Sequence, residues 1–141
     1  LGQASKRPHL SVEARGHNVC DPSPDNTGRL PAAALIEAGG PGYLASTLPV
    51  ERIVARINDL GLPVQRSDDA GGYLCNHTLY KALAWAGSTP AAPEIGFIHV
   101  PGVPGADPEI QGMPLQDMVA AVRSAIEAIT RDQGSEVIGK H

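Results

Sequence analysis

The sequence predicts an α/β fold of three layers, α/β/α, with a mostly parallel, twisted sheet in the middle. Three observations predict this class. Short apolar and β-branched runs alternate with longer segments of helical period, glycine and proline gather in the connections, and the order along the chain is strand, helix, strand, helix. Because 141 residues of 42% hydrophobic composition can bury one sizeable core, we expect a single domain over residues 1–141.

The first third of the chain predicts two short strands separated by a long loop. Alternation of apolar and polar residues predicts a strand near 9–13, which places Glu13 at a strand end. Residues 20–28 are rich in proline, aspartate and asparagine, which is typical of a loop. A second short strand is expected at 33–37, where a Gly-Gly-Pro-Gly run soon ends it.

The middle of the chain predicts a helix, a strand and a second helix. Apolar residues follow helical spacing over 49–60, with proline in the first turn and glycine as the stop. Residues 63–67 form the next predicted strand. A turn with consecutive glycines then leads into a predicted helix over 73–86.

The last third predicts a buried strand followed by a final helix. Residues 94–100 form an apolar run between two prolines, which suits a buried strand and places His99 at its C-terminal end. An irregular loop is expected at 101–113 and a helix at 115–129. The tail over 133–141 is expected to be frayed.

Composition and charge exclude several classes of function. The formal net charge is −4, from 15 acidic and 11 basic residues, and the basic residues are scattered, so we expect no nucleic-acid or membrane partner. No apolar run is long enough to span a bilayer and no secretory leader is evident, which predicts a cytoplasmic protein. Two cysteines make no disulfide framework, although a bridge between Cys20 and Cys75 stays open.

A cysteine at a helix start and a histidine at a strand end are the residues that point to chemistry. Cys75 falls in the first turn of the helix over 73–86, where unpaired N–H groups favour the thiolate. Nucleophilic attack on an amide also needs a base, and sites in parallel sheets gather at the carboxyl ends of strands, where His99 is expected. On spacing alone, an inert buried cysteine and histidine remain the commoner interpretation.

Several segments taken in order resemble the pyroglutamyl peptidase I family, also called pyrrolidone-carboxylate peptidase. The two longest are Ala-Gly-Gly-Tyr-Leu-Cys-Asn at 70–76, with Tyr80 after it, and Gly-Phe-Ile-His-Val-Pro at 96–101. The shorter ones are Gly-Gln-Ala at 2–4, Val-Glu at 12–13, Pro-Asp-Asn at 24–26 and Ser-Thr-Leu-Pro at 46–49. The resemblance runs through nearly all of the chain and covers the C-terminal portion of a typical member.

This resemblance implies a cysteine exopeptidase that removes an N-terminal pyroglutamyl residue from peptides through a thioester. It implies that Cys75 is the nucleophile, His99 the general base and acid, and Glu13 the acid that orients His99. No cofactor or metal is implied. Backbone N–H groups at the start of the Cys75 helix would form the oxyanion hole. The family also assembles into dimers or tetramers, so a homo-oligomer is expected.

The resemblance extends to the substrate pocket, with departures. It implies that Gln3 binds the pyroglutamyl ring through polar contacts, and that Tyr73 and Leu74 line the ring pocket. The family's first strand and aromatic pocket walls have no counterpart here, so we expect a fragment or a truncated form that lacks the N-terminal strand of the sheet. Residues 22–23 (Pro-Ser) replace a basic and an apolar residue of the family.

Two other functions stay open. A non-catalytic truncated homologue would keep the triad but lack the pocket, and a thiol hydrolase with an altered pocket would act on another substrate. We assign no role to Cys20.

Other polar residues have simpler interpretations. The four remaining histidines lack the spacing of metal ligands, and His77 points to a different side of its helix from Cys75, so it is not the expected base. Asp68 and Asp69 could form an acid–base pair, but carboxylates in a turn before a helix more often accept hydrogen bonds from backbone N–H groups.

Overall fold

The computed structural model describes residues 1–105 and 112–130 of the chain. Contacts between residues divide the chain into two compact units, and each unit is described by itself. The first unit comprises Leu1–Val12, Leu48–Arg66 and Ile98–His141, and the second comprises Glu13–Thr47 and Ser67–Phe97. The predicted tail at 133–141 and part of the predicted loop at 101–113 lie outside the described residues.

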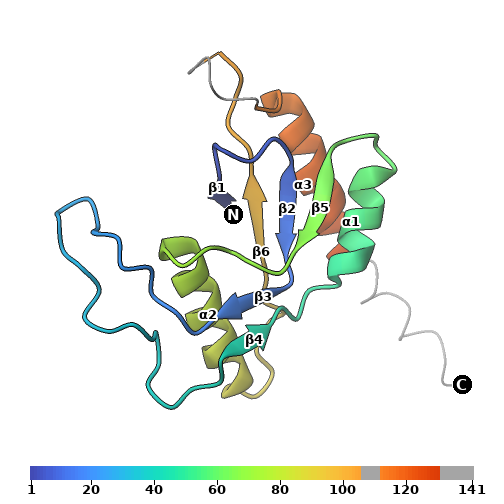
Figure 1. Ribbon diagram of the computed structural model, residues 1–141. Helices are drawn as coiled ribbons and strands as arrows, with labels where there is room; N and C mark the ends of the chain where they lie inside the picture. Colours follow the sequence, from blue (N-terminus) through green and yellow to red (C-terminus); the bar gives the residue numbers. More distant parts are fainter. Residues whose placement is uncertain (106–111, 131–141) are drawn as a thin grey trace, which may run out of the picture. The chain divides into compact units, whose positions relative to one another are not determined.

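The main sheet has four strands within the described residues. These strands are β1 (Gly2–Gln3), β2 (Leu10–Glu13), β5 (Val64–Ser67) and β6 (Phe97–Val100), in the spatial order β1-β6-β2-β5. Strands β1 and β6 are parallel, with Gly2 opposite His99. In Figure 1, β2 and β5 point the same way and β6 points the opposite way, so the sheet is mixed but mostly parallel.

The core of the first unit forms where helices α1 (Val50–Asn58) and α3 (Leu115–Thr130) pack on each other and on the sheet. Helix α1 carries Glu51 in its first turn and Arg56 in its last, where each charge suits the helix dipole. The buried residues of this core are Leu10, Val12, Ile53, Ile57, Ile98, Met113, Met118, Ala121, Ala125 and Ala128. None of the helices in the described ranges is long and apolar enough to cross a membrane.

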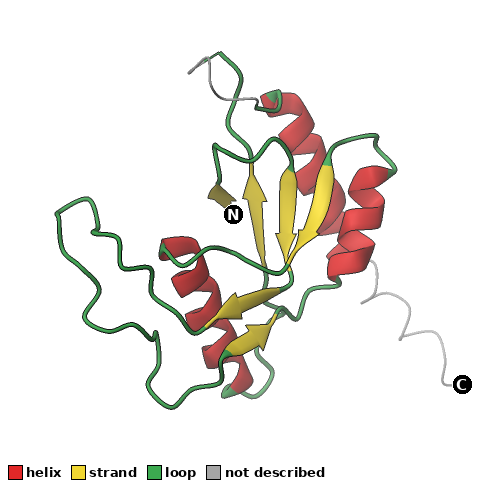
Figure 2. Cartoon of the chain, in the orientation of Figure 1, coloured by secondary structure: helices red, strands yellow, loops and turns green. Residues whose placement is uncertain are grey.

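In the second unit, one helix packs on a short antiparallel hairpin, as Figure 2 shows. The hairpin consists of β3 (Arg15–His17) and β4 (Tyr43–Ala45), and the helix is α2 (Leu74–Gly87). Strand β3 approaches α2 very closely, because a Cβ atom on Gly16 would lie 2.9 Å from the backbone nitrogen of Tyr80. Glycine therefore permits this contact between strand and helix.

The predicted α/β class is confirmed, and most predicted elements are present with shifts of up to three residues at their ends. Strands β2, β5 and β6 correspond to the predictions at 9–13, 63–67 and 94–100, and helices α1, α2 and α3 to those at 49–60, 73–86 and 115–129. The strand predicted at 33–37 is wrong, since this segment is irregular and mostly exposed. The carbonyl oxygen of Ala34 accepts a hydrogen bond from the N–H of Cys20, but the segment joins neither sheet of the described residues, and β4 forms after the glycine-rich run.

Tyr80 anchors the long connection between β3 and β4 to helix α2. Its side chain is fully buried, and its hydroxyl donates a 2.9 Å hydrogen bond to the carbonyl oxygen of Pro41. Burial, together with the nearby Glu37 carboxylate, raises the pKa of Tyr80 above its ordinary value. The neutral phenol is therefore the form that the folded protein favours.

Stability is consequently expected to fall as the pH rises above about 10, where tyrosine in the unfolded chain begins to ionise. Below that pH, the contribution of the neutral Tyr80 is fully present. Tyr80→Phe is expected to be less stable by about 1 kcal/mol at neutral pH, because the hydrogen bond is lost, but to lose less stability between pH 9 and 11. Urea unfolding at several pH values measures both effects. Parallel decreases in the two proteins at high pH would contradict the assignment.

Candidate active site

Cys75 is the second residue of helix α2, as the sequence predicts, and it is half-buried. Tyr73 occupies the N-cap position in an extended conformation, and its side chain makes no capping hydrogen bond. The N–H groups of a first helical turn lack partners within the helix and attract negative charge. The start of α2 is therefore suited to stabilise a thiolate and an oxyanion.

A tight turn brings the chain into this helix. Gly71 has a φ of +82°, a conformation that favours glycine, and its N–H donates a 2.8 Å hydrogen bond to Oδ1 of Asp69. The next carbonyl oxygen, that of Gly72, accepts a 2.6 Å bond from the N–H of Asp21. The residues immediately before Cys75 are thus fixed by the turn itself and by the loop after β3.

A cavity of about 150 Å³ adjoins the start of α2. It is lined by Tyr73 and Leu74, for which the family resemblance implies a place in the ring pocket, and by His77 one turn later. The loop after β3 forms the other wall, with Cys20 and Arg29 among its residues. This cavity has the size of a small ring, and both walls belong to the second unit.

Two carboxylates on the loop wall are held in their ionised form. The hydroxyl of Thr27 and the N–H groups of Arg29 and Thr27 donate to Asp25 and lower its pKa. Ser23 lowers the pKa of Asp21 in the same way. Because hydrogen bonds to the charged form stabilise it, both side chains carry negative charge at neutral pH.

His99 and Gln3 lie together in the first unit. His99 is the third residue of β6 and is only 4% exposed. The neighbouring strand β1 pairs Gly2 with His99 and Gln3 with Val100, and Gln3 is exposed. The predicted base and the predicted polar contact to the ring are therefore on adjacent strands.

Glu13 is the last residue of β2 and is fully buried. It belongs to the second unit, which also contains Tyr73, Leu74 and Cys75. The six predicted site residues thus form two groups, one in each unit.

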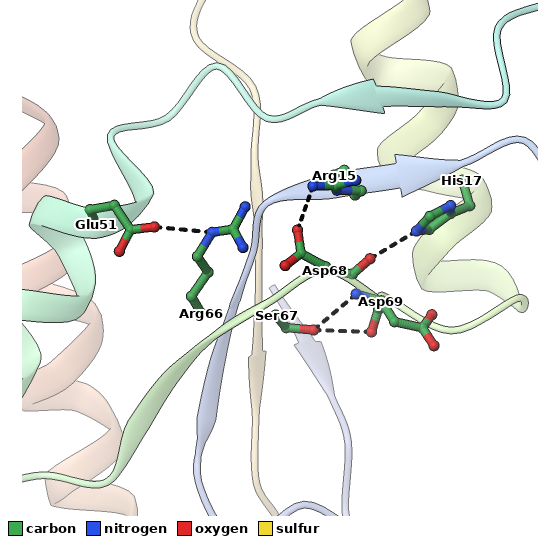
Figure 3. A network of polar contacts seen from close by, with 7 residues as sticks. All are labelled: Arg15, His17, Glu51, Arg66, Ser67, Asp68 and Asp69. Atoms are coloured by element: carbon green, nitrogen blue, oxygen red, sulfur yellow. Dashed lines mark hydrogen bonds and ion pairs between the residues drawn. The ribbon is translucent and has the colours of Figure 1, made fainter.

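The two turn aspartates before α2 have structural partners, and Figure 3 shows those of Asp68. Oδ1 of Asp68 lies 2.8 Å from Nη2 of Arg15, and the carbonyl oxygen of Asp68 accepts a 2.8 Å hydrogen bond from Nε2 of His17. Asp69 accepts the bond from Gly71 described above. The sequence favoured the interpretation that these carboxylates accept hydrogen bonds from backbone N–H groups. This is confirmed for Asp69. The Asp68 carboxylate instead forms an ion pair with Arg15.

Other candidate sites are less suited to catalysis. Cys20 and Cys75 are both free thiols, so the bridge left open by the sequence is not formed. The described residues contain no cluster of histidine, cysteine and carboxylate side chains that could hold a metal ion. A larger surface groove of about 600 Å³ lies along α1 and α3, beside the ion pair of Arg56 and Glu127, and contains none of the predicted site residues.

Sequence reasoning assigned no role to two residues near the start of α2. Arg29 lines the cavity, and its only sequence signal is its position just after the Pro-Asp-Asn turn. Asn76 follows Cys75 directly and is fully buried. The sequence shows an asparagine early in a predicted helix, but it does not show that this side chain is buried, which is unusual for asparagine.

Comparisons with known proteins agree on one family. The family model for pyroglutamyl peptidase matches residues 1–132. The pyrrolidone-carboxylate peptidase of Chromobacterium violaceum is 40% identical over 136 residues, which cover 93% of this chain and 62% of that protein. The pyrrolidone-carboxylate peptidase 1 of Caldanaerobacter subterraneus is 36% identical over 135 residues, with 93% and 66% covered.

Solved structures show the same relationship. The pyrrolidone carboxyl peptidase of Thermococcus litoralis superposes with a TM-score of 0.87 at 30% identity, covering 94% of this chain and 64% of that one. The pyroglutamyl peptidase I of Bacillus amyloliquefaciens gives 0.84 at 30% identity, with 91% and 62% covered. The chain spans less than two thirds of the length of these four proteins. The fold, the family match and the identities together show that the chain belongs to the pyroglutamyl peptidase family.

Proposed function

We propose that the protein is a cysteine exopeptidase that removes an N-terminal pyroglutamyl residue from peptides. The observation that carries the proposal is the position of Cys75 in the first turn of α2, at a helix start without a side-chain cap. The names of the relatives, pyrrolidone-carboxylate peptidase and pyroglutamyl peptidase, support the substrate class. The reaction needs no cofactor.

In the first half of the proposed reaction, His99 takes the proton of the Cys75 thiol, and the thiolate attacks the carbonyl carbon of the pyroglutamyl residue that is bonded to the next amino acid. The N–H groups at the start of α2 stabilise the resulting oxyanion. His99 gives a proton to the departing amine as the C–N bond breaks, which leaves a thioester on Cys75. His99 then takes a proton from a water molecule, and the hydroxide displaces Cys75 to release pyroglutamate.

Glu13 is proposed to orient the His99 imidazole during both proton transfers. A buried carboxylate and a buried imidazole are costly in a protein interior unless they interact with polar groups. Glu13 is fully buried at the end of β2, and His99 is 4% exposed within β6. Two such residues at core positions of an α/β fold support a catalytic role for the pair.

The cavity beside α2 is proposed to receive the pyroglutamyl ring. Its volume of about 150 Å³ suits a neutral five-membered lactam, and Tyr73 and Leu74 supply apolar surface. Gln3 is proposed to contact the lactam through polar groups. Specific sites for small molecules usually combine apolar walls with a small number of placed polar groups.

Release of a fluorescent amine from a pyroglutamyl amide tests the function. A proline amide is the matched control, because its ring has the same size but lacks the lactam carbonyl. We expect the pyroglutamyl amide to be hydrolysed at least about 100-fold faster, since a site built to bind a polar group rejects analogues without it. No release from folded protein would contradict the proposal and favour a non-catalytic homologue. Equal release from both amides would favour a hydrolase of different specificity.

A further inference from the structure

Asn76 connects the first turn of α2 to strand β3 through its side-chain amide. Its Oδ1 accepts a 2.8 Å hydrogen bond from the N–H of His17. Its Nδ2 donates to the carbonyl oxygen of His17 at 2.8 Å and to that of Val19 at 3.3 Å. The side-chain amide therefore binds both the N–H and the carbonyl oxygen of His17, in the way that the backbone of a neighbouring strand would bind them.

The contact between α2 and β3 is buried and closely packed. The Asn76 side chain is fully buried, so each hydrogen bond forms away from competing water. One turn further along α2, the backbone of Tyr80 packs directly against Gly16. Helix and strand are thus locked together at two successive turns.

The segment that contains Cys75 is held on both sides. Before it, the carbonyl oxygen of Gly72 accepts the 2.6 Å bond from Asp21. After it, Asn76 binds the strand that begins two residues beyond Glu13. Removal of the Asn76 bonds would leave the packing of Tyr80 against Gly16, one turn further along α2, as the next contact with β3 after Cys75.

We propose that Asn76 is a positioning residue, which fixes the Cys75 thiol at the helix start by clamping α2 to β3. The inference rests on the proposed function, in which Cys75 is the nucleophile. A displacement of about 1 Å in a reacting group can cost about 100-fold in rate, even when the mutated residue does not touch the substrate. Loss of the clamp should therefore lower kcat more than it raises KM, because Tyr73 and Leu74 still line the cavity.

Asn18 provides a matched control for the loss of a buried amide. It is 2% exposed, accepts a 2.8 Å bond from the N–H of Glu37, and donates to the carbonyl oxygens of Glu37 and Gly40 at 2.8 and 3.3 Å. These bonds hold the loop between β3 and β4 and do not involve α2. Asn18→Ala and Asn76→Ala each remove three hydrogen bonds from the same unit, but only the second change releases the Cys75 helix.

The experiment measures kcat and KM per folded molecule, together with urea unfolding, for both variants. We expect Asn76→Ala to lower kcat about 100-fold with KM changed less than about threefold, and Asn18→Ala to keep kcat within about threefold. If Asn76→Ala does not fold, Asn76→Asp keeps the acceptor for the His17 N–H but loses both donors, and a kcat equal to wild type would overturn the proposal.

A second readout separates this inference from the proposed function. In a Cys20→Ser background, the rate of alkylation by iodoacetamide reports only on Cys75, because Cys20 is the other cysteine of the chain. We expect Asn76→Ala to change this rate at a fixed pH, because the thiol leaves its position at the helix start, while Asn18→Ala leaves the rate unchanged. Inactive wild-type protein with that change in rate would reject the peptidase function but keep the positioning role. Identical alkylation rates and identical kcat values in the two variants would overturn the positioning role.

Discussion

Cys75→Ser is expected to lower hydrolysis of a pyroglutamyl amide by about 10⁴-fold or more, while the free energy of unfolding stays close to that of the wild type. Serine replaces sulfur by oxygen with little change in shape, so the packing at the start of α2 is kept. Its hydroxyl is far less acidic than a thiol, and the site would have to generate a much stronger base to use it. Initial rates with the fluorescent amide and urea unfolding measure the two quantities.

Cys20→Ser is the matched control, because Cys20 is the other free thiol of the chain and lines the cavity beside α2. The proposed mechanism gives Cys20 no chemical step, so this variant should retain most of its activity. A Cys75→Ser protein that hydrolyses the amide at more than about one tenth of the wild-type rate would contradict the assignment of the nucleophile.

Gly16→Val is expected to destabilise the protein by about 3 kcal/mol, near the upper end of typical costs for overpacking. A Cβ atom at this position would lie 2.9 Å from the backbone nitrogen of Tyr80 and 3.1 Å from its Cα. Helix backbone cannot move aside as a flexible side chain can, so β3 must separate from α2. Urea unfolding gives the change in free energy, and the activity of the remaining folded protein should fall as well.

Gly42→Val controls for the loss of glycine in the same unit. A Cβ atom on Gly42 meets no heavy atom within 4 Å, and its backbone does not need a positive φ. Its substitution should change stability by no more than about 0.5 kcal/mol. Equal losses for Gly16→Val and Gly42→Val would mean that the close approach of β3 to α2 does not limit the fold.

The helices were predicted well, because the residues that start a helix, give it an apolar face and end it all lie within a few turns of one another in the sequence. Helix α1 follows a proline, repeats apolar residues at helical spacing and stops before Gly61, whose φ is +72°. Helix α2 likewise follows a turn that needs glycine at position 71. Strands β2, β5 and β6 were predictable from short runs with clear ends.

The hairpin of the second unit could not be predicted, because its signals are distant in the sequence. Strand β3 consists of Arg-Gly-His, which has no apolar alternation, and it forms because β4 pairs with one edge and Asn76 binds the other. The segment at 33–37 has the apolar composition of a strand, yet it joins neither sheet of the described residues, and Leu35 is 49% exposed. Burial and pairing, which decide strands, are not local properties.

The site was predictable in part for the same reason. The chemistry of Cys75, and its place at the start of a helix, follow from residues 68–76 alone. The wall of the cavity depends on hydrogen bonds across many residues, such as the bond between Asp21 and Gly72, and no local pattern contains them. Asn76 is similar, because nothing in the sequence around it reveals that its partner is the backbone of His17.

The connection over residues 18–42 has one further consequence, which concerns how relatives can diverge. Asn18 closes this connection near its base by binding Glu37 and Gly40, and the cavity wall lies inside the closed segment. Doubling the length of a flexible loop costs only roughly 0.6 kcal/mol in closure entropy. Insertions and substitutions between the two ends can therefore reshape the cavity while β3 and α2 stay in place. Apart from Asp21 and Pro41, whose backbone groups bind Gly72 and Tyr80, the residues of this loop can alter substrate range at little cost in fold stability.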